Sequence, residues 1–361
     1  MTSLIKPPRA CALILTFNSI SRHGSLVFKA INSILSARSV DKVIVVDNNS
    51  TDSTIQSIEE EFGNDIKIFK LKHNYGYAGA HSLVSKLIKQ TCRYVIILND
   101  DYIVDPEGIE DILRVIIERE DLAIAQGINL SLEGGERVLD AGAFIDIHGN
   151  VIRRCGGLKL DECPPEPSYI SLANGACMVV KLDKVLKLRE SLFCRNYFMY
   201  AEDDELSLYL WSHGFKVVSV PVVAGFHKQG HLSNFSYIYL FRNRMLNIHH
   251  YYVGVLHSMK PLIILRYLAR AISLPPPSSK HATRGLIAYL DYLLKKKRNI
   301  ECAYNRGPYY PLILAPRSIR TCAKSFIPIT RFMTDYINEI SSLTLNDNML
   351  KQSANLYIIR V

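Results

Sequence analysis

The feature that most constrains the fold is the alternation of apolar, β-branched runs with helical patterns over residues 10–98. The runs "ACALILTF", "DKVIVVDNNS", "DIKIFKL" and "RYVIIL" have the composition of strands, and the segments between them carry apolar residues at helical spacing. Each strand and the following helix take about 25 to 30 residues. This order predicts a parallel sheet that is covered by helices on both faces.

Polar residues follow each of these runs, at the point where each strand is predicted to end. In open sheets of this kind, ligands bind beyond the carboxyl ends of the strands. The same residue types are common in ordinary turns, but their recurrence at one edge favours a binding site. The residues concerned are Asn18, then Asp47, Asn48 and Asn49, then His73, Asn74 and Gly76, and then Asn99, Asp100 and Asp101.

The composition is that of a globular protein. With 361 residues, of which 48% are hydrophobic and 21% charged, the chain can bury a full core and form one large domain with an appendage, or two domains. The net charge of +9 suits an anionic partner, such as a nucleotide phosphate, a nucleic acid or an acidic membrane surface. Charge alone does not choose among these partners.

The first 20 residues and the cysteines indicate a cytoplasmic protein. The apolar stretch near the start is too short and too interrupted for a signal peptide or a membrane span, so we interpret it as a first strand. The eight cysteines are scattered without a CxxC pair, which favours reduced thiols packed as small hydrophobic side chains. A zinc site and disulfides remain the alternatives.

The pattern changes at about residue 120. Shorter segments, from "LAIAQGINL" to "NVIRRCGG", predict an antiparallel appendage, and the Pro-rich stretch 161–168 predicts a mobile surface loop. Residues 197–227 predict a turn, a helix and two strands that end at His227. We place one domain, which carries the predicted binding edge, at residues 8–234 and a helical region at 235–361.

The helical region is basic and amphipathic. Its aliphatic and aromatic residues alternate with Arg and Lys at helical spacing, as in helices that lie on a membrane surface. The alternative is that these helices pack on the main domain or on a second copy of the chain. No run is long enough to span a bilayer.

Seven short motifs stand in the order found in family 2 glycosyltransferases, the inverting enzymes of the GT-A fold. They are "ILTFNS", "VIVVDNNSTDST", "HNYGYAGA", "YVIILNDD", "NGACMVV", "FMYAEDDELSLYLWSHGF" and "VAGFHKQG". The resemblance covers about residues 10–245 and is strongest to the rhamnosyltransferase and galactofuranosyltransferase-like branch. It implies an α/β, GT-A-like, doubly wound and mostly parallel sheet with a small antiparallel appendage and a helical C-terminal region.

The resemblance also implies a nucleotide-sugar donor, UDP- or dTDP-linked, and a Mg²⁺ or Mn²⁺ ion. A divalent cation stabilises the negative charge that builds on a departing diphosphate, and it prefers carboxylate ligands. Adjacent Asp100 and Asp101 can supply them, because a dication offsets the repulsion between like charges. Relatives carry acids at both outer positions of this motif, whereas Asn99 is neutral here. We therefore predict Asp101 as the main ligand, with Asp100 binding the metal or the ribose, and His227 as a further ligand.

The remaining donor contacts are assigned by the same resemblance. Helix capping and a solvated helix face are the ordinary alternatives for Asn49 and Arg242. The Gly-bearing turn before residue 79 would present backbone N–H groups to an anion. The predicted donor-binding residues are Thr16, Asn18, Asp47, Asn49, Asn74, Gly76, Gly79, Asn99, Asp100 and Arg242.

The catalytic candidates lie in "AEDDE", residues 201–205. Inversion by direct displacement needs one base that takes the proton of the acceptor hydroxyl. The resemblance assigns this role to Asp203, with Glu202 orienting the acceptor or the base, and Asp204 is the alternative base. Acids also gather at helix N-termini for purely electrostatic reasons.

The sequence therefore predicts an inverting glycosyltransferase that acts on a glycan or lipid-linked acceptor, peripheral on the inner face of the membrane, with a homo-oligomer left open. A non-catalytic glycan- or membrane-binding relative remains an alternative. A sugar-nucleotide nucleotidylyltransferase is disfavoured, because the turn "TFNSISRHG" lacks the expected Gly-rich loop with Arg and Lys. No recognition motif supports a nucleic-acid binder.

Overall fold

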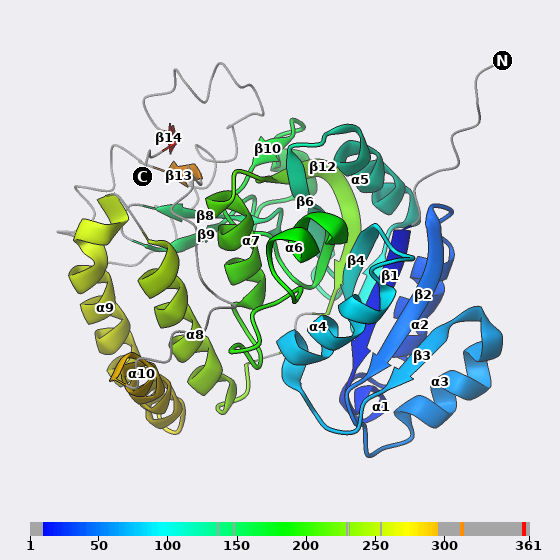
Figure 1. Cartoon of the computed structure of the whole chain (residues 1–361), viewed down its shortest axis with the longest axis horizontal. Coiled ribbons are helices and arrows are strands. Elements are labelled where there is room, and N and C mark those ends of the chain that lie inside the picture. Colours follow the sequence, from blue (N-terminus) through cyan, green and yellow to red (C-terminus); the bar gives the residue numbers. More distant parts are fainter. Residues whose placement is uncertain are drawn as a thin grey trace.

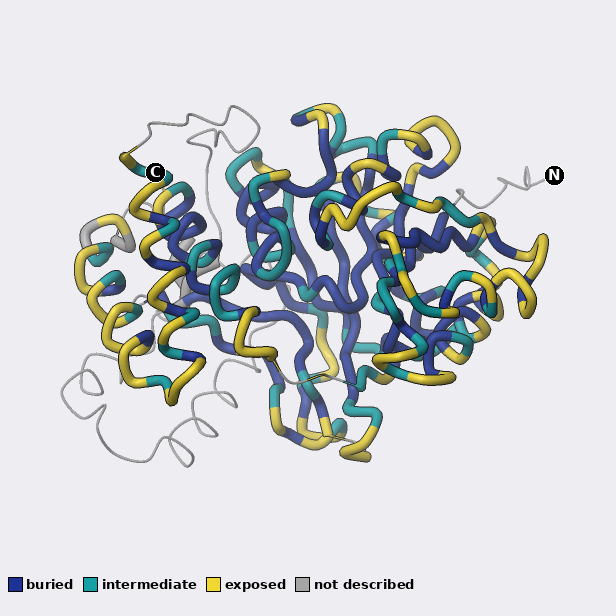
Figure 2. The backbone as a smooth tube through the Cα atoms, turned by 90° about the horizontal axis from the view of Figure 1, so that it is seen from below, coloured by how far each residue is buried: buried dark blue, intermediate teal, exposed yellow. Residues whose placement is uncertain are grey.

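The computed structural model describes residues 10–135, 137–146, 149–228, 230, 232–252 and 255–294, together with two short strands at 311–313 and 356–358. A central sheet forms the core, helices cover both of its faces, and three helices stand together at one end (Figure 1). The buried backbone runs through the middle of the molecule (Figure 2).

The first half of the sheet is parallel, as the sequence predicts. Its strands lie in the order β4-β1-β2-β3, and helices α1 to α4 connect them. The apolar runs of β1, β2 and β4 form strands because their side chains are buried on both faces, which suits β-branched residues, whereas the edge strand β3 is only partly buried. The elements are β1 (Ala10–Thr16), α1 (Ser19–His23), α2 (Leu26–Leu35), β2 (Val40–Asp47), α3 (Thr54–Phe62), η1 (Gly63–Asp65), β3 (Lys67–Lys70), α4 (Gly76–Ile88) and β4 (Tyr94–Asn99).

The second half of the sheet is mixed, in the order β10-β12-β6-β11, with β11 next to β4. Strand β5 pairs with β12, and β7 pairs with β6. The elements are β5 (Tyr102–Val104), α5 (Pro106–Glu118), β6 (Leu122–Ser131), β7 (Val138–Asp140), η2 (Leu160–Glu162), β10 (Ser168–Tyr169), β11 (Cys177–Lys181), α6 (Leu182–Leu188), α7 (Glu202–Ser212) and β12 (Lys216–His227).

Two sequence predictions for this half are wrong. The run at Leu122–Ser131 was expected in the antiparallel appendage, but β6 lies inside the central sheet and is buried along nearly all of its length. The segment before His227 was expected to form two strands, but it forms the single strand β12. Register shifts between Ser219 and Val223, around Pro221, bend this strand without interrupting it.

The small second sheet confirms an appendage. Strands β8 (Ala143–Asp146) and β9 (Val151–Arg153) pair antiparallel, and β13 (Pro311–Ile313) and β14 (Leu356–Ile358) extend them. The Pro-rich connector is tied to this region, because the buried Arg154 guanidinium donates hydrogen bonds to the backbone oxygens of Pro164 (3.3 Å) and Glu166 (3.1 Å).

Three C-terminal helices follow: α8 (Ser236–Tyr251), α9 (Val255–Ser273) and α10 (Ser278–Leu294). Helix α8 lies beyond the boundary predicted at residue 234, yet its side chains Phe241, Met245 and Leu246 belong to the same buried core as the sheet. It packs against α7 on one side and α10 on another. Among the described residues, no helix combines the length and the apolar character that crossing a bilayer would require.

The prediction of reduced thiols is wrong for five cysteines. Cys11 is bonded to Cys92 and Cys155 to Cys163, and Cys194 is also disulfide-bonded. Cys11 and Cys92 meet because β1 pairs with β4, although 81 positions separate them in the chain. Within the described residues Cys177 is a free, buried cysteine, and Cys302 and Cys322 lie outside them. Disulfides persist mainly in oxidising compartments.

Candidate active site

The carboxyl ends of the parallel strands meet at one edge of the sheet. Strand pairing places Thr16 beside Asp47, and Leu15 beside Asn99. The polar residues that follow β1, β2 and β4 are therefore neighbours in space. This is the edge at which sheets of this type bind ligands.

The turns after β1 and β2 support each other. The buried carboxylate of Asp47 accepts hydrogen bonds from the backbone N–H of Ser50, at 3.1 and 3.3 Å. The Oδ1 atom of Asn18 accepts one from the backbone N–H of Thr51, at 2.7 Å. Asn18 and Asn49 both have positive φ, at 51° and 70°. These side chains shape the turns on which a nucleotide would lie.

The side chains of Thr16 and Asn49 make fewer hydrogen bonds than those of Asn18 and Asp47. The hydroxyl of Thr16 is buried and donates to the backbone oxygen of Val46 over 3.4 Å. The side chain of Asn49 is exposed at the same edge. Both are therefore close to the predicted nucleotide position, and only Asn49 reaches solvent.

The turn before α4 is organised by Asn48, which the predicted set of site residues omits. Its Nδ2 donates to Asn74 Oδ1 (2.9 Å), and its Oδ1 accepts from the backbone N–H of Tyr75 (2.9 Å). Gly76 has φ of +70°, and a Cβ atom there would lie 2.1 Å from the backbone oxygen of Phe198. A Cβ on Gly79 would lie 3.0 Å from that of Tyr75. Glycine at position 76 is thus required both by the backbone conformation and by the close approach of the segment around Phe198.

Asp101 and His227 form a close pair beyond β4. The Asp101 Oδ1 and His227 Nε2 atoms are 3.1 Å apart, and Asn99 Nδ2 lies 3.5 Å from the same ring nitrogen. Burial acts to raise the pKa of Asp101, but the hydrogen bond and charge of His227 outweigh it, and the pKa lies below its usual value. His227 reaches this position as the last residue of β12.

Asp100 has different partners. Its carboxylate accepts a hydrogen bond from the Ser19 hydroxyl and lies 3.9 Å from His23 Nε2. Burial raises the pKa of Asp100, and the neighbouring charge of Asp101 adds to the effect. Over the described part of the chain, no three His, Cys, Asp or Glu side chains gather closely enough to hold a metal ion. Asp101 and His227 could still supply two ligands to a divalent cation, because carboxylate oxygen and imidazole nitrogen both bind such ions.

A second acidic group, Glu202, Asp203 and Asp204, opens helix α7. Asp203 accepts hydrogen bonds from the backbone N–H groups of Gly175 (2.8 Å) and Asp204 (2.9 Å). Burial raises the pKa of Asp203 in spite of these bonds. Burial also raises the pKa of Glu202 well above its usual value, and the Oε2 atom of Glu202 has no hydrogen-bond partner among the described residues.

The structure brings the two acidic groups together. The backbone N–H of Asn99 donates to the oxygen of Ala176 (3.0 Å), and the adjacent Gly175 donates to Asp203. The hydroxyl of Tyr77 donates to the oxygen of Gly175 (2.7 Å). Burial raises the pKa of Tyr77, and the negative charges of Glu202, Asp203 and Asp100 raise it further. The Tyr77 hydroxyl is therefore within electrostatic reach of both acidic groups.

A buried polar network, absent from the sequence prediction, connects the two sides of the site. The carboxylate of Asp140 accepts from Gln126 Nε2 (2.6 Å), Asn129 Nδ2 (3.0 Å) and Asn174 Nδ2 (2.8 Å). Asn129 Oδ1 in turn accepts from the hydroxyl of Tyr102, whose ring packs against His227. In the sequence, the sign of this network is the acidic residue Asp140 within the otherwise apolar stretch "VLDAGAF".

A cavity of about 180 Å³ opens beside Asp203. Arg244 lines it, whereas the predicted Arg242 donates instead to the backbone oxygen of Asn196, and burial lowers the Arg242 pKa. Burial and the charge of Asp203 raise the pKa of Asp204, another lining residue, to about 7. The other polar lining residues are Asp140, Arg153 and Asn174.

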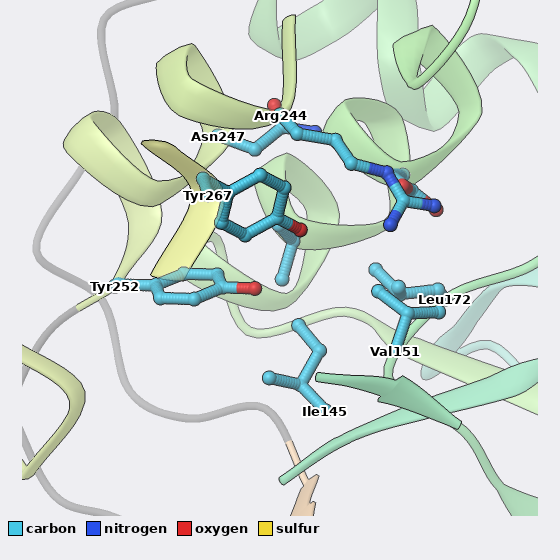
Figure 3. A pocket seen from close by; sticks show the side chains of 9 residues that line it. Ile145, Val151, Leu172, Arg244, Asn247, Tyr252 and Tyr267 are labelled. Carbon is cyan, nitrogen blue, oxygen red and sulfur yellow. The ribbon is translucent and has the colours of Figure 1, made fainter. Parts of the chain in front are cut away.

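A smaller pocket of about 10 Å³ adjoins this cavity and shares Asp204 and Arg244 with it. Figure 3 shows Arg244 and Asn247 projecting from the same helix, with the Arg244 side chain extended past Tyr267 toward Val151 and Leu172. Helix α8 therefore contributes directly to the wall of the site region.

The fold is that of the GT-A glycosyltransferases. A crystal structure of GalNAc-T7 with UDP, GalNAc and Mn²⁺ aligns with a TM-score of 0.53 and 13% identity, covering 81% of this chain and 57% of that one. A structure of S. aureus TarS 1–349 in complex with UDP-GlcNAc aligns with a TM-score of 0.50 and 14% identity, covering 79% and 81%. This chain thus spans little more than half the length of GalNAc-T7.

Residues 11–157 match the model of Glycosyl transferase family 2. No curated protein sequence matches the chain. The likeness to a glycosyltransferase therefore depends on the family match and on the fold.

Proposed function

We propose that the protein is an inverting glycosyltransferase that moves a sugar from a UDP- or dTDP-linked donor to a glycan hydroxyl. The observation that carries this proposal is the meeting of the two acidic groups around Gly175 and Tyr77. One group lies at the edge where nucleotides bind, and the other offers a carboxylate with a raised pKa. A transfer reaction needs these two functions in one site.

The donor side would use the turns after β1, β2 and β3. Asp101 and His227 would hold the Mg²⁺ or Mn²⁺ ion, which supplies stabilisation of the charge that develops on the diphosphate. Asp100, held by Ser19, would accept hydrogen bonds from the ribose. GalNAc-T7 and TarS were crystallised with UDP or a UDP-sugar, which supports a uridine nucleotide.

The acceptor side would use Asp203 as the base. A raised pKa makes a carboxylate a stronger base, and two backbone N–H groups fix the orientation of Asp203. The cavity beside Asp203 carries carboxylate, amide and guanidinium groups, which suit the hydroxyls of a sugar. Glu202, buried next to Asp203, would help to orient the base.

Replacement of Asp203 tests the proposal. A thermal-shift screen of UDP-glucose, UDP-galactose, UDP-GlcNAc and dTDP-rhamnose with Mn²⁺ identifies the donor, because a bound donor stabilises the folded protein. Asp203→Asn should then lower kcat by about 10²- to 10⁴-fold while the donor Kd changes little. Asp204→Asn is the matched control and should lose less than about tenfold. Loss of donor binding in Asp203→Asn, or a larger kcat loss in Asp204→Asn, contradicts the assignment.

The acceptor would be carried on a membrane-bound lipid. Many residues of the helices at one end of the molecule are exposed (Figure 2). In α9 and α10 they include the large apolar residues Leu265 at 60%, Ile272 at 75% and Leu290 at 53%. Residues 255–294 contain five Lys or Arg and one Asp. A basic and apolar surface of this kind suits an anionic bilayer.

Vesicle binding decides this part of the proposal. The protein should sediment with vesicles of phosphatidylcholine and phosphatidylglycerol, and the double variant Leu265→Ser/Ile272→Ser should lose most of that binding without loss of donor binding. Equal sedimentation of variant and wild type contradicts the membrane contact. A concentration-dependent dimer that the same variant abolishes would assign the surface to a second copy of the chain instead.

A further inference from the structure

The segment that leads into helix α7 has an unfavourable backbone conformation. Tyr200 and Ala201 have φ of 68° and 62°, so two consecutive residues with side chains adopt the left-handed conformation directly before Glu202 and Asp203. Residues other than glycine rarely adopt it, and they keep it only where the surroundings impose it. Some other part of the structure must therefore hold residues 196–201.

Helix α8 supplies the contacts that hold this segment. The Nδ2 atom of Asn243 donates to the backbone oxygens of Met199 (2.9 Å) and Tyr200 (2.8 Å). The Nδ2 atom of Asn247 donates to the oxygen of Ala201 (3.1 Å). Asn243 and Asn247, hereafter the asparagine pair, are four positions apart and thus lie on one face of the helix. Together they engage three successive carbonyl groups.

The asparagine pair is itself fixed in place. The side chains of Asn243 and Asn247 are 0% and 4% exposed, and Asn247 Oδ1 accepts a hydrogen bond from the Tyr197 hydroxyl (2.6 Å). Burying an amide is unfavourable unless its hydrogen bonds are made. The Oδ1 atom of Asn243 has no hydrogen-bond partner among the described residues, so this amide is held by the two bonds that its Nδ2 donates.

The opposite side of the segment faces the predicted donor site. The backbone oxygen of Phe198 accepts a hydrogen bond from the backbone N–H of Ala78 (3.3 Å). The same oxygen lies so close to Gly76 that a Cβ atom on residue 76 would clash with it. Residues 196–201 therefore lie between the turn on the nucleotide side and helix α8. The asparagine pair holds the end of the segment, residues 199–201, that directly precedes Glu202 and Asp203.

We infer that Asn243 and Asn247 are positioning residues for the transfer reaction: they hold residues 199–201 in the conformation that places the Asp203 carboxylate. The inference rests on the proposed function, because it takes Asp203 as the base. It makes helix α8 part of the catalytic unit. In this role the asparagine pair acts through the backbone of residues 199–201.

The test compares Asn243→Leu and Asn247→Leu with the control Tyr251→Phe. Tyr251 is also buried on α8, but its hydroxyl donates to Glu205 (2.5 Å), away from residues 196–201. With the donor found by the thermal-shift screen, each Asn variant should lose about 100-fold in kcat with donor KM within about twofold, since a displacement of about 1 Å can cost that much. Tyr197→Phe frees only Asn247 and should lose about tenfold. Tyr251→Phe should keep wild-type kcat.

Hydrogen exchange without any substrate gives a second readout. The amides of residues 199–203 should exchange at least about tenfold faster in the Asn variants and in Tyr197→Phe than in Tyr251→Phe, as expected for a locally released segment. Unchanged exchange, or a kcat loss no larger than in Tyr251→Phe, overturns the inference. If the wild type turns over no donor, the proposed function fails, and exchange still decides whether the asparagine pair holds the segment. If the Asn variants do not fold, wild-type kcat together with wild-type exchange in Tyr197→Phe overturns the inference for Asn247, and a loss in both supports it.

Discussion

The buried ion pair between Arg189 and Glu205 of helix α7 gives the most quantitative prediction. Arg189 Nη1 donates to both carboxylate oxygens of Glu205, at 2.8 and 2.9 Å, and the two side chains are only 3% and 0% exposed. Arg189 also donates to the backbone oxygens of Leu192 (2.6 Å) and Ser191 (3.0 Å). Arg189→Met would leave the buried Glu205 carboxylate without its cation, although it would still accept a hydrogen bond from the Tyr251 hydroxyl. Breaking one side of such a pair costs about 3–5 kcal/mol of unfolding free energy.

Urea unfolding measures this change directly. Trp211, the single tryptophan of the chain, lies in helix α7 and reports on the region by its fluorescence. At about 2–4 °C per kcal/mol, the melting temperature of Arg189→Met should fall by roughly 10 °C. The double variant Arg189→Met/Glu205→Met should recover part of the loss, since no buried charge is left unpaired.

The exposed pair of Arg114 and Asp111 is the matched control. These side chains are 67% and 43% exposed, so Arg114→Met should cost less than about 1 kcal/mol. A loss below about 1 kcal/mol in Arg189→Met, or a double variant less stable than either single variant, would refute the reasoning.

Two further predictions concern the site. Gly76→Ala should weaken donor binding, and it should lower the unfolding free energy by more than the control Gly24→Ala. Both glycines have positive φ, but only a Cβ atom at position 76 would lie 2.1 Å from the Phe198 oxygen. Equal effects of the two substitutions would contradict the close approach. Asp204→Asn should flatten the dependence of stability on pH. Burial and the charge of Asp203 raise the folded pKa of Asp204 to about 7, from an ordinary value of 3.8, so its favourable contribution is present below about pH 4 and is lost as the pH rises through 7. Urea unfolding at pH 4, 5.5 and 8 checks this, and an unchanged slope between pH 4 and 7 in Asp204→Asn would contradict it.

The parallel half of the fold was predictable because its strands are buried on both faces and its helices follow at regular spacing. Strand β6 was misplaced for a related reason. Its apolar content identifies a strand, but only pairing with β11 and β12, which follow much later in the chain, decides the sheet to which it belongs. Strand pairing of this kind is non-local, and local patterns do not record it.

The candidate site was predictable where a residue carries its chemistry in a motif. Asp101, Asp203 and His227 belong to such motifs, and the structure brings Asp101 to His227 and the Asn99 backbone to the segment that holds Asp203. Asp140 and Asn247 were not found, because their importance lies in hydrogen bonds to distant partners. The disulfide between Cys11 and Cys92 was missed because its two cysteines are also far apart in the sequence.

Strand β12 has one further consequence. It runs beside β6 and ends with the imidazole that faces Asp101, so the number of residues after the register shift at Pro221 determines which side chain lies next to Asp101. Loss of one residue from this stretch would bring Lys228 to that place, an ammonium group without a lone pair to share with a metal. The length of β12 therefore matters to the site as much as the identity of its last residue.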